Sequence, residues 1–310
     1  MVPRGSDMTP GTGGAGRSGT GGAGRPGTGG AGRSATVCSM EPFVSVDWLR
    51  EHRDEVVLAD LRFYLDGRPG RPAYEAGHIP GAVYVELEEA LSEPHQDDLR
   101  GRHPLASPQR FAAQLGALGI GDADVVVAYD DCGGVIAARL VWLLRITGGQ
   151  AALLDGGLGA WPERELERQT PPARPPAQFT ARPWPRERFA AIDELGQTTD
   201  VMIDARDSSR FHGGPDPVDP RSGHIPGARN VPTREHIEAD GLIGQPERLR
   251  ERFAAAGILA GTPVISYCGS GVSACHNLLA LERAGLGPGR LYVGSWSEWS
   301  RDPRRPIATD

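Results

Sequence analysis

Short apolar runs alternate with longer amphipathic stretches along most of the chain. The runs at 125–129 (VVVAY) and 263–267 (PVISY) are rich in Val and Ile, as buried strands are. The stretches at 108–118 and 246–256 space their apolar residues as amphipathic helices do. Because strands that alternate with helices form parallel sheets, the pattern predicts an α/β fold with helices on both faces of each sheet.

The same pattern occurs twice, which indicates a duplicated domain. Both halves carry the segment HIPGA, at 78–82 and at 224–228, after an apolar run that ends in Asp-x-Arg. Each half ends near a tryptophan. Trp161 lies 31 residues after Asp130, and Trp299 lies 31 residues after Cys268, where Asp130 and Cys268 directly follow the two apolar runs. Several shared landmarks in the same order are typical of an internal repeat.

Proline and glycine content predicts the domain boundaries. The segment 165–185 is rich in proline, which helix interiors and central strands exclude, so we expect a linker there. It separates a first domain at 37–164 from a second at 186–310. Residues 1–36 hold 13 of the 43 glycines and repeat GTGGAGR three times, which predicts a flexible tail. Its residues 2–6 resemble the remnant of a cleaved protease site.

Composition narrows the class of protein. The 310 residues carry a net charge of -7, which argues against a strongly basic nucleic-acid binder. No apolar run approaches the roughly 20 residues of a membrane helix. Four cysteines are too few for a disulfide scaffold, so we expect a reducing compartment, the cytoplasm. All basic side chains are arginine, which excludes Schiff-base and Walker-type lysine chemistry.

Cys268 is the candidate nucleophile. It follows the apolar run 263–267 and precedes a helical pattern, so it lies at the edge of the sheet where α/β proteins bind ligands. Gly269 and Gly271 let the loop curl until the backbone N–H groups of residues 269 to 273 point inward, where they hold an anion and favour a thiolate. The alternative is a buried structural cysteine, which would not require this glycine pattern.

The other cysteines and the loop composition exclude further chemistries. Cys38, Cys132 and Cys275 lack the glycine-rich setting and are expected to be inert, although Cys275 lies two helical turns past Cys268 and leaves open a weak resolving-thiol role. Ala274 stands where cysteine-type phosphatases need an arginine. The chain has no Cys-x-x-Cys and no zinc-ligand spacing, so we expect neither a dithiol centre nor a metal.

These motifs together resemble the rhodanese superfamily of tandem-domain sulfurtransferases. The resemblance spans about residues 41–305 and is carried by the two HIPGA segments and by the stretches 154–158 (LDGGL), 268–274 (CGSGVSA) and 294–299 (GSWSEW). It implies transfer of a sulfane sulfur through a cysteine persulfide, without a metal or organic cofactor. It also implies a catalytically inactive first domain, because Asp130 takes the place of the catalytic cysteine there.

Within the family, the loop is similar to that of the 3-mercaptopyruvate sulfurtransferases. Relatives specific for thiosulfate carry basic residues after the cysteine, whereas positions 269 to 274 are uncharged here. The resemblance assigns substrate carboxylate binding to Arg210 and Arg221, with bidentate geometry natural to arginine. It assigns substrate contacts in the loop to Gly269, Gly271, Val272 and Ser273.

The resemblance also implies a Ser-His-acid proton relay. Ser270 matches the serine, His103 matches a histidine supplied by the other domain, and Glu88 falls where the family usually has aspartate. A relay is needed because cleavage of the C–S bond leaves an enolate that must be protonated. The alternatives are a Ser270 hydroxyl that only bonds the loop backbone and a solvent-facing His103.

Duplicated polar residues are expected to be structural. His78 and His224 occur in both HIPGA segments, although only one domain has the cysteine, so we expect both to hydrogen-bond the turn. Arg62 and Arg206 are likewise repeated and predict an ion pair within each domain.

We therefore predict a sulfurtransferase that moves sulfur from 3-mercaptopyruvate to a thiol, such as thioredoxin, or to cyanide, and that binds neither nucleic acid nor membrane. The alternatives are a thiosulfate:cyanide sulfurtransferase, a non-catalytic binding module, and a sulfur relay fed by a protein donor.

Overall fold

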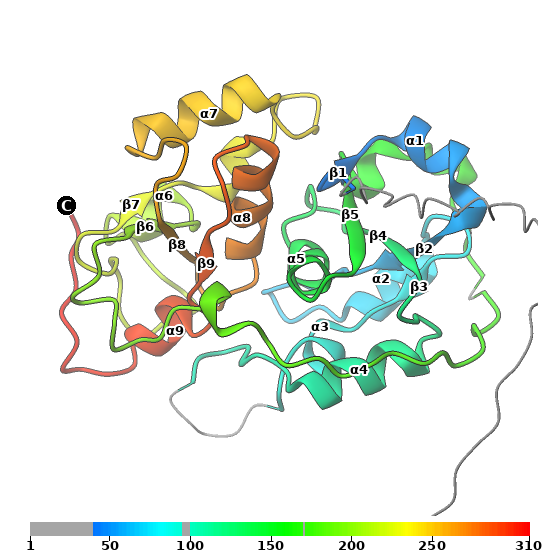
Figure 1. Ribbon diagram of the computed structural model, residues 1–310, viewed down its shortest axis with the longest axis horizontal. Helices are drawn as coiled ribbons and strands as arrows, with labels where there is room; N and C mark the ends of the chain where they lie inside the picture. The colour runs from blue at the N-terminus through cyan, green and yellow to red at the C-terminus, as the bar shows by residue number, and fades with distance from the viewer. Residues whose placement is uncertain (1–39, 95–99, 170) are drawn as a thin grey trace, which may run out of the picture. The chain divides into compact units, whose positions relative to one another are not determined.

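The apolar runs form two parallel sheets (Figure 1). The computed structural model describes residues 40–94, 100–169 and 171–310, so the predicted tail at 1–36 and Cys38 lie outside the described residues. The first sheet has the order β1-β5-β4-β2-β3, with β1 Phe43–Val44, β2 Val56–Asp60, β3 Val83–Tyr84, β4 Val125–Tyr129 and β5 Gln150–Leu154. The second has the order β7-β6-β8-β9, with β6 Val201–Asp204, β7 Arg229–Asn230, β8 Val264–Tyr267 and β9 Arg290–Leu291.

Short helices follow the strands in each half. Those of the first half are α1 Val46–Glu51, α2 Gly70–Ala76, α3 Leu87–Ala90, α4 Pro108–Ala117 and α5 Ala138–Ile146. Those of the second half are α6 Ser208–Phe211, α7 Pro246–Ala255, α8 Ala274–Arg283 and α9 Ser295–Trp299. The predicted α/β architecture is confirmed. Among the described residues, none of these helices combines the length and apolar character needed to cross a membrane.

Burial on both faces explains why the strands are apolar throughout. In β2, Val57 and Ala59 face one core cluster, while Val56 and Leu58 face another on the opposite side of the sheet. The first of these clusters continues without interruption into the second half, where it includes Ile203 of β6. The halves therefore share a core, with α5 and α8 packed side by side between the sheets (Figure 1).

Residues 171–185 of the proline-rich segment have no regular secondary structure, and they pack along α4. The Ala177 N–H donates to the Gly116 carbonyl at 2.9 Å, and the Trp184 indole N–H donates to the Ala106 carbonyl at 2.9 Å. Phe179 meets Phe111 edge to face. The segment therefore runs over the surface of the first half before the chain enters β6.

The duplicated polar residues make the same contacts in both halves. Arg62 pairs with Asp60 at 2.8 Å, and Arg206 pairs with Asp204 at 2.7 Å, which confirms the predicted ion pairs. The Nδ1 atoms of the two HIPGA histidines lie within hydrogen-bond distance of carbonyls in the preceding helix, His78 at Tyr74 and His224 at Phe211. Both histidines are therefore structural, as predicted, but they bond to the helix before the turn and not to the turn itself.

Candidate active site

Cys268 lies directly after β8, at the carboxyl edge of the second sheet. Cys268 is only 2% exposed, and its Sγ accepts a hydrogen bond from the Gly271 N–H at 3.1 Å. Gly271 has φ +72°, and a Cβ there would come within 2.4 Å of the Val293 carbonyl, so only glycine fits. The loop thus aims a backbone N–H at the sulfur, a donor that an anionic sulfur can accept.

Ser295 hydrogen-bonds the backbone of Cys268. Its φ of +53° is the only left-handed value among the described residues other than glycine. Its hydroxyl accepts the Cys268 N–H at 3.1 Å and donates to the Tyr292 carbonyl at 2.9 Å. Such strain persists only where the surroundings fix it. Ser295 belongs to the 294–299 motif, but its contact with Cys268 was not predicted from the sequence.

The equivalent loop of the first half shows what this backbone binds. Asp130 follows β4 as Cys268 follows β8, and its carboxylate accepts four backbone N–H groups at 2.7 to 3.0 Å, from Cys132, Gly134, Ile136 and Ala137. The loop is therefore an anion nest that the chain fills with its own carboxylate. A carboxylate cannot accept a sulfur atom, so Asp130 cannot form a persulfide at this place in the first half.

The predicted relay residues come together across the two halves. His103 Nδ1 lies 2.9 Å from Ser270 Oγ, and both residues are buried. Glu88 is mostly exposed, and its carboxylate lies 3.7 Å from His103 Nε2, an ion-pair distance longer than a hydrogen bond. Burial lowers the pKa of His103 below its ordinary value, which Glu88 opposes and the charges of Arg139 and Arg102 reinforce. The imidazole is therefore neutral near pH 7.

Two arginines converge beside the nucleophile. A Cβ built on Gly269 would lie 3.0 Å from one terminal nitrogen of Arg102 and 3.9 Å from both of Arg210. Both guanidinium groups pair with Asp219, each at 2.9 Å, and Arg210 also pairs with Asp216. Glycine at 269 allows this approach. Arg102 was not predicted, although it is the neighbour of His103 in the sequence.

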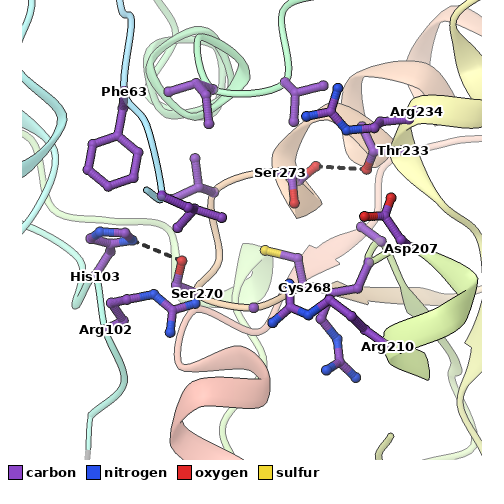
Figure 2. A pocket seen from close by; sticks show the side chains of 17 residues that line it. Phe63, Arg102, His103, Asp207, Arg210, Thr233, Arg234, Cys268, Ser270 and Ser273 are labelled. Carbon is purple, nitrogen blue, oxygen red and sulfur yellow. Dashed lines mark hydrogen bonds between the residues drawn. The ribbon is translucent and has the colours of Figure 1, made fainter. Parts of the chain in front are cut away.

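A cavity of about 140 Å³ joins these groups, which suits a small ligand. Figure 2 shows His103 and Ser270 on one side of Cys268, and Asp207 and Arg234 on the other. The first half contributes an apolar wall, and the second contributes most of the cationic side chains; the lining residues include Phe63, Val135, Ile136, Gly269, Val272 and Ser273. Gly271, whose N–H donates to the sulfur, does not line the cavity.

Comparison with known proteins agrees with the fold and the duplication. Residues 45–164 and 190–302 each match the rhodanese-like domain family. The chain belongs to the rhodanese family.

Similar proteins cover most of this rhodanese chain. A Pseudomonas aeruginosa protein named "Probable 3-mercaptopyruvate sulfurtransferase" is 43% identical over 268 residues, 82% of this chain and 93% of the relative. An Arabidopsis thaliana protein named "Thiosulfate/3-mercaptopyruvate sulfurtransferase 2" is 31% identical over 306 residues, 88% of each. The structure of 3-mercaptopyruvate sulfurtransferase from Leishmania major matches with a TM-score of 0.78 at 30% identity, covering 86% of this chain and 76% of that one.

Arg221 is placed differently from the expectation. It does not line the rhodanese cavity. Its guanidinium donates to four backbone carbonyls, those of Trp299, Ser300, Asp302 and Arg305. These bonds use its donors to fix the segment after α9, so Arg221 has a structural position and Arg102 takes its place beside Arg210.

The remaining described thiols are poor nucleophiles. Burial raises the pKa of both Cys275 and Cys132 far above the ordinary value. Cys275 is fully buried and directs its sulfur toward the Gly271 carbonyl, which removes the weak case for a resolving thiol. Within the described residues, no group of three or more His, Cys, Asp or Glu side chains is arranged to hold a metal ion.

Proposed function

We propose that this rhodanese transfers a sulfur atom from 3-mercaptopyruvate to a thiol or to cyanide, through a persulfide on Cys268, and releases pyruvate. The observation that carries the proposal is the arrangement around Cys268: its sulfur accepts the Gly271 N–H, two guanidinium groups approach Gly269, and His103 bonds Ser270. The first feature suits a thiolate, the second suits a carboxylate, and the third suits a proton transfer.

The chemistry balances with these groups alone. The Cys268 thiolate attacks the thiol sulfur of the donor, an S–S bond forms, and the C–S bond breaks. The electron pair of the C–S bond stays with the carbon atom, so the leaving group is the enolate of pyruvate. The proton of the donor thiol is transferred to the enolate carbon, so the products are pyruvate and an anionic persulfide, and no proton is taken from solvent overall.

The relay is suited to carry that proton. Because the pKa of His103 is lowered, its neutral imidazole accepts the proton through Ser270 and then returns it to the enolate. A histidine already protonated at rest could not perform the first half of this cycle.

The loop after Cys268 is suited to hold the negatively charged persulfide. In the equivalent loop of the first half, four backbone N–H groups donate to the carboxylate of Asp130. We propose that the loop after Cys268, including the N–H groups near Val272 and Ser273, stabilises the outer sulfur of the persulfide in the same way. A thiol such as thioredoxin, or cyanide, then removes that sulfur.

The donor is tested by comparing two substrates. We expect kcat/KM for pyruvate release from 3-mercaptopyruvate to exceed kcat/KM for sulfite release from thiosulfate, because Arg102 and Arg210 match a single carboxylate. The reverse ratio would make the chain a thiosulfate sulfurtransferase, the alternative suggested by the paired name of the Arabidopsis relative. Turnover of neither donor would leave a binding module or a protein-fed relay. We place the protein in a reducing compartment, the cytoplasm, because the reaction consumes thiols.

Arg210→Met is expected to raise KM for 3-mercaptopyruvate about 10- to 100-fold with little change in kcat. The carboxylate remains bound from the ground state through the transition state, and one charge-assisted hydrogen bond is worth about 1.5–3 kcal/mol. Steady-state kinetics of pyruvate release measure the effect, and Arg210→Lys, which keeps the charge, should recover part of it.

Arg221→Met is the matched control. We expect KM to stay unchanged, while the free energy of unfolding falls by about 2 kcal/mol as charge-assisted bonds to backbone carbonyls are lost. A KM increase in Arg221→Met as large as that in Arg210→Met would return Arg221 to the substrate site.

A further inference from the structure

Arg139 is a buried cation beneath the active site. It lies on α5 of the first half and is 0% exposed. Its guanidinium donates to the His103 carbonyl at 3.0 Å and to the Ser270 carbonyl at 3.4 Å. Among the described residues its Nε has no hydrogen-bond partner, and no carboxylate forms an ion pair with it.

Burying a cation without a counter-charge costs free energy of desolvation, and hydrogen bonds to backbone carbonyls compensate that cost only in part. Besides the carbonyls, the negatively charged groups that can form near Arg139 are the thiolates of Cys275 and Cys268, and Cys268 lies two residues before Ser270, whose carbonyl the guanidinium bonds. Cys275 is a poor partner because burial strongly disfavours its thiolate. Cys268 is therefore the remaining partner.

We propose that Arg139 is a positioning residue that supplies the buried counter-charge for the Cys268 thiolate and persulfide and fixes His103 against Ser270. The inference rests on the proposed function of that site. It also gives the first half a role, because this half provides the cation as well as His103. Asn277, which occupies the corresponding place on α8, is uncharged and bonds within its own half at Val231 and Thr233.

Other charged groups also face the nucleophile. The cavity is lined by Arg102, His103, Arg206, Asp207, Arg210 and Arg234. Arg206, Arg210 and Arg102 each pair with buried carboxylates, which reduces their effect on the sulfur. Neither Arg139 nor Arg234 has such a carboxylate among the described ion pairs, but Arg234 is exposed to solvent, which screens its charge, whereas Arg139 is fully buried.

The test is alkylation of Cys268 by iodoacetamide without any sulfur donor, with the modified peptide identified by mass spectrometry. At pH 7 we expect Arg139→Gln to lower the rate about tenfold, since a nearby opposite charge shifts a thiolate population by about this much or more. At pH 10, above the ordinary pKa of a cysteine thiol, the rates should converge. Arg139→Lys keeps the charge, so its rate at pH 7 should remain close to the wild-type rate. The lysine should still lower kcat, because it cannot bond both carbonyls as the planar guanidinium does.

Arg145→Gln is the matched control. Arg145 lies on the same helix and also reaches across to the second half, where it pairs with Glu282, but it does not line the cavity. The rate of Cys268 alkylation in Arg145→Gln should equal the wild-type rate. A folded Arg139→Gln with the wild-type rate at pH 7, or a deficit that persists at pH 10, would overturn the proposal. Alkylation needs no donor, so inactivity toward 3-mercaptopyruvate would count against the proposed function and leave this test intact.

Discussion

Cys268→Ser is expected to abolish sulfur uptake from 3-mercaptopyruvate. A hydroxyl cannot form the S–S bond, and the loop N–H groups cannot ionise it near neutral pH, so turnover should fall at least about 10⁴-fold. Intact mass after brief exposure to the donor measures the effect directly. The wild-type protein should gain one sulfur atom and release pyruvate, and the variant should do neither.

Cys132→Ser is the control for this experiment. Cys132 lies in the equivalent loop of the first half, two residues after Asp130, and burial disfavours its thiolate. The variant should gain the same sulfur as the wild-type protein. Sulfur that stays on the chain after Cys268→Ser, or disappears after Cys132→Ser, would place the persulfide elsewhere.

Local patterns were sufficient to predict the fold and the place of Cys268 directly after a strand of the second sheet. The sheets depend on short apolar runs, and the anion nest depends on glycines next to Cys268, so both can be predicted from residues that are neighbours in the sequence. The pairing of His103 with Ser270 joins residues 167 positions apart, and only the family resemblance indicated it.

Residues whose role depends on packing between segments could not be placed from sequence. Arg210 and Arg221 look alike in the sequence, but the segment after α9 supplies carbonyls that bind Arg221, whereas Arg210 reaches the loop at Gly269. Arg102 reaches the same loop from the other half. Arg139 sits in an ordinary helical pattern, and its importance appears only when α5 packs under the catalytic loop.

His103→Asn is expected to lower kcat for 3-mercaptopyruvate about 10²- to 10³-fold, the range of general acid–base catalysis. Asparagine can still hydrogen-bond Ser270 but cannot carry a proton. Transfer from thiosulfate should change little, because sulfite leaves without an enolate to protonate. Ser270→Ala should show the same dependence on the donor. Equal losses with both donors would mean that His103 and Ser270 only hold the loop in place.

The pH profile of the same reaction tests the charge state and the role of Glu88. The relay starts from neutral His103, so activity should be lost as the pH falls through its pKa. Because burial lowers that pKa, the acid limb of kcat for 3-mercaptopyruvate should lie below the ordinary histidine range. Glu88 favours the imidazolium, so Glu88→Gln should move the limb to lower pH and leave the rate at pH 7 nearly unchanged. A limb that moves to higher pH, or a large loss at pH 7, would instead give Glu88 a direct part in the proton transfer.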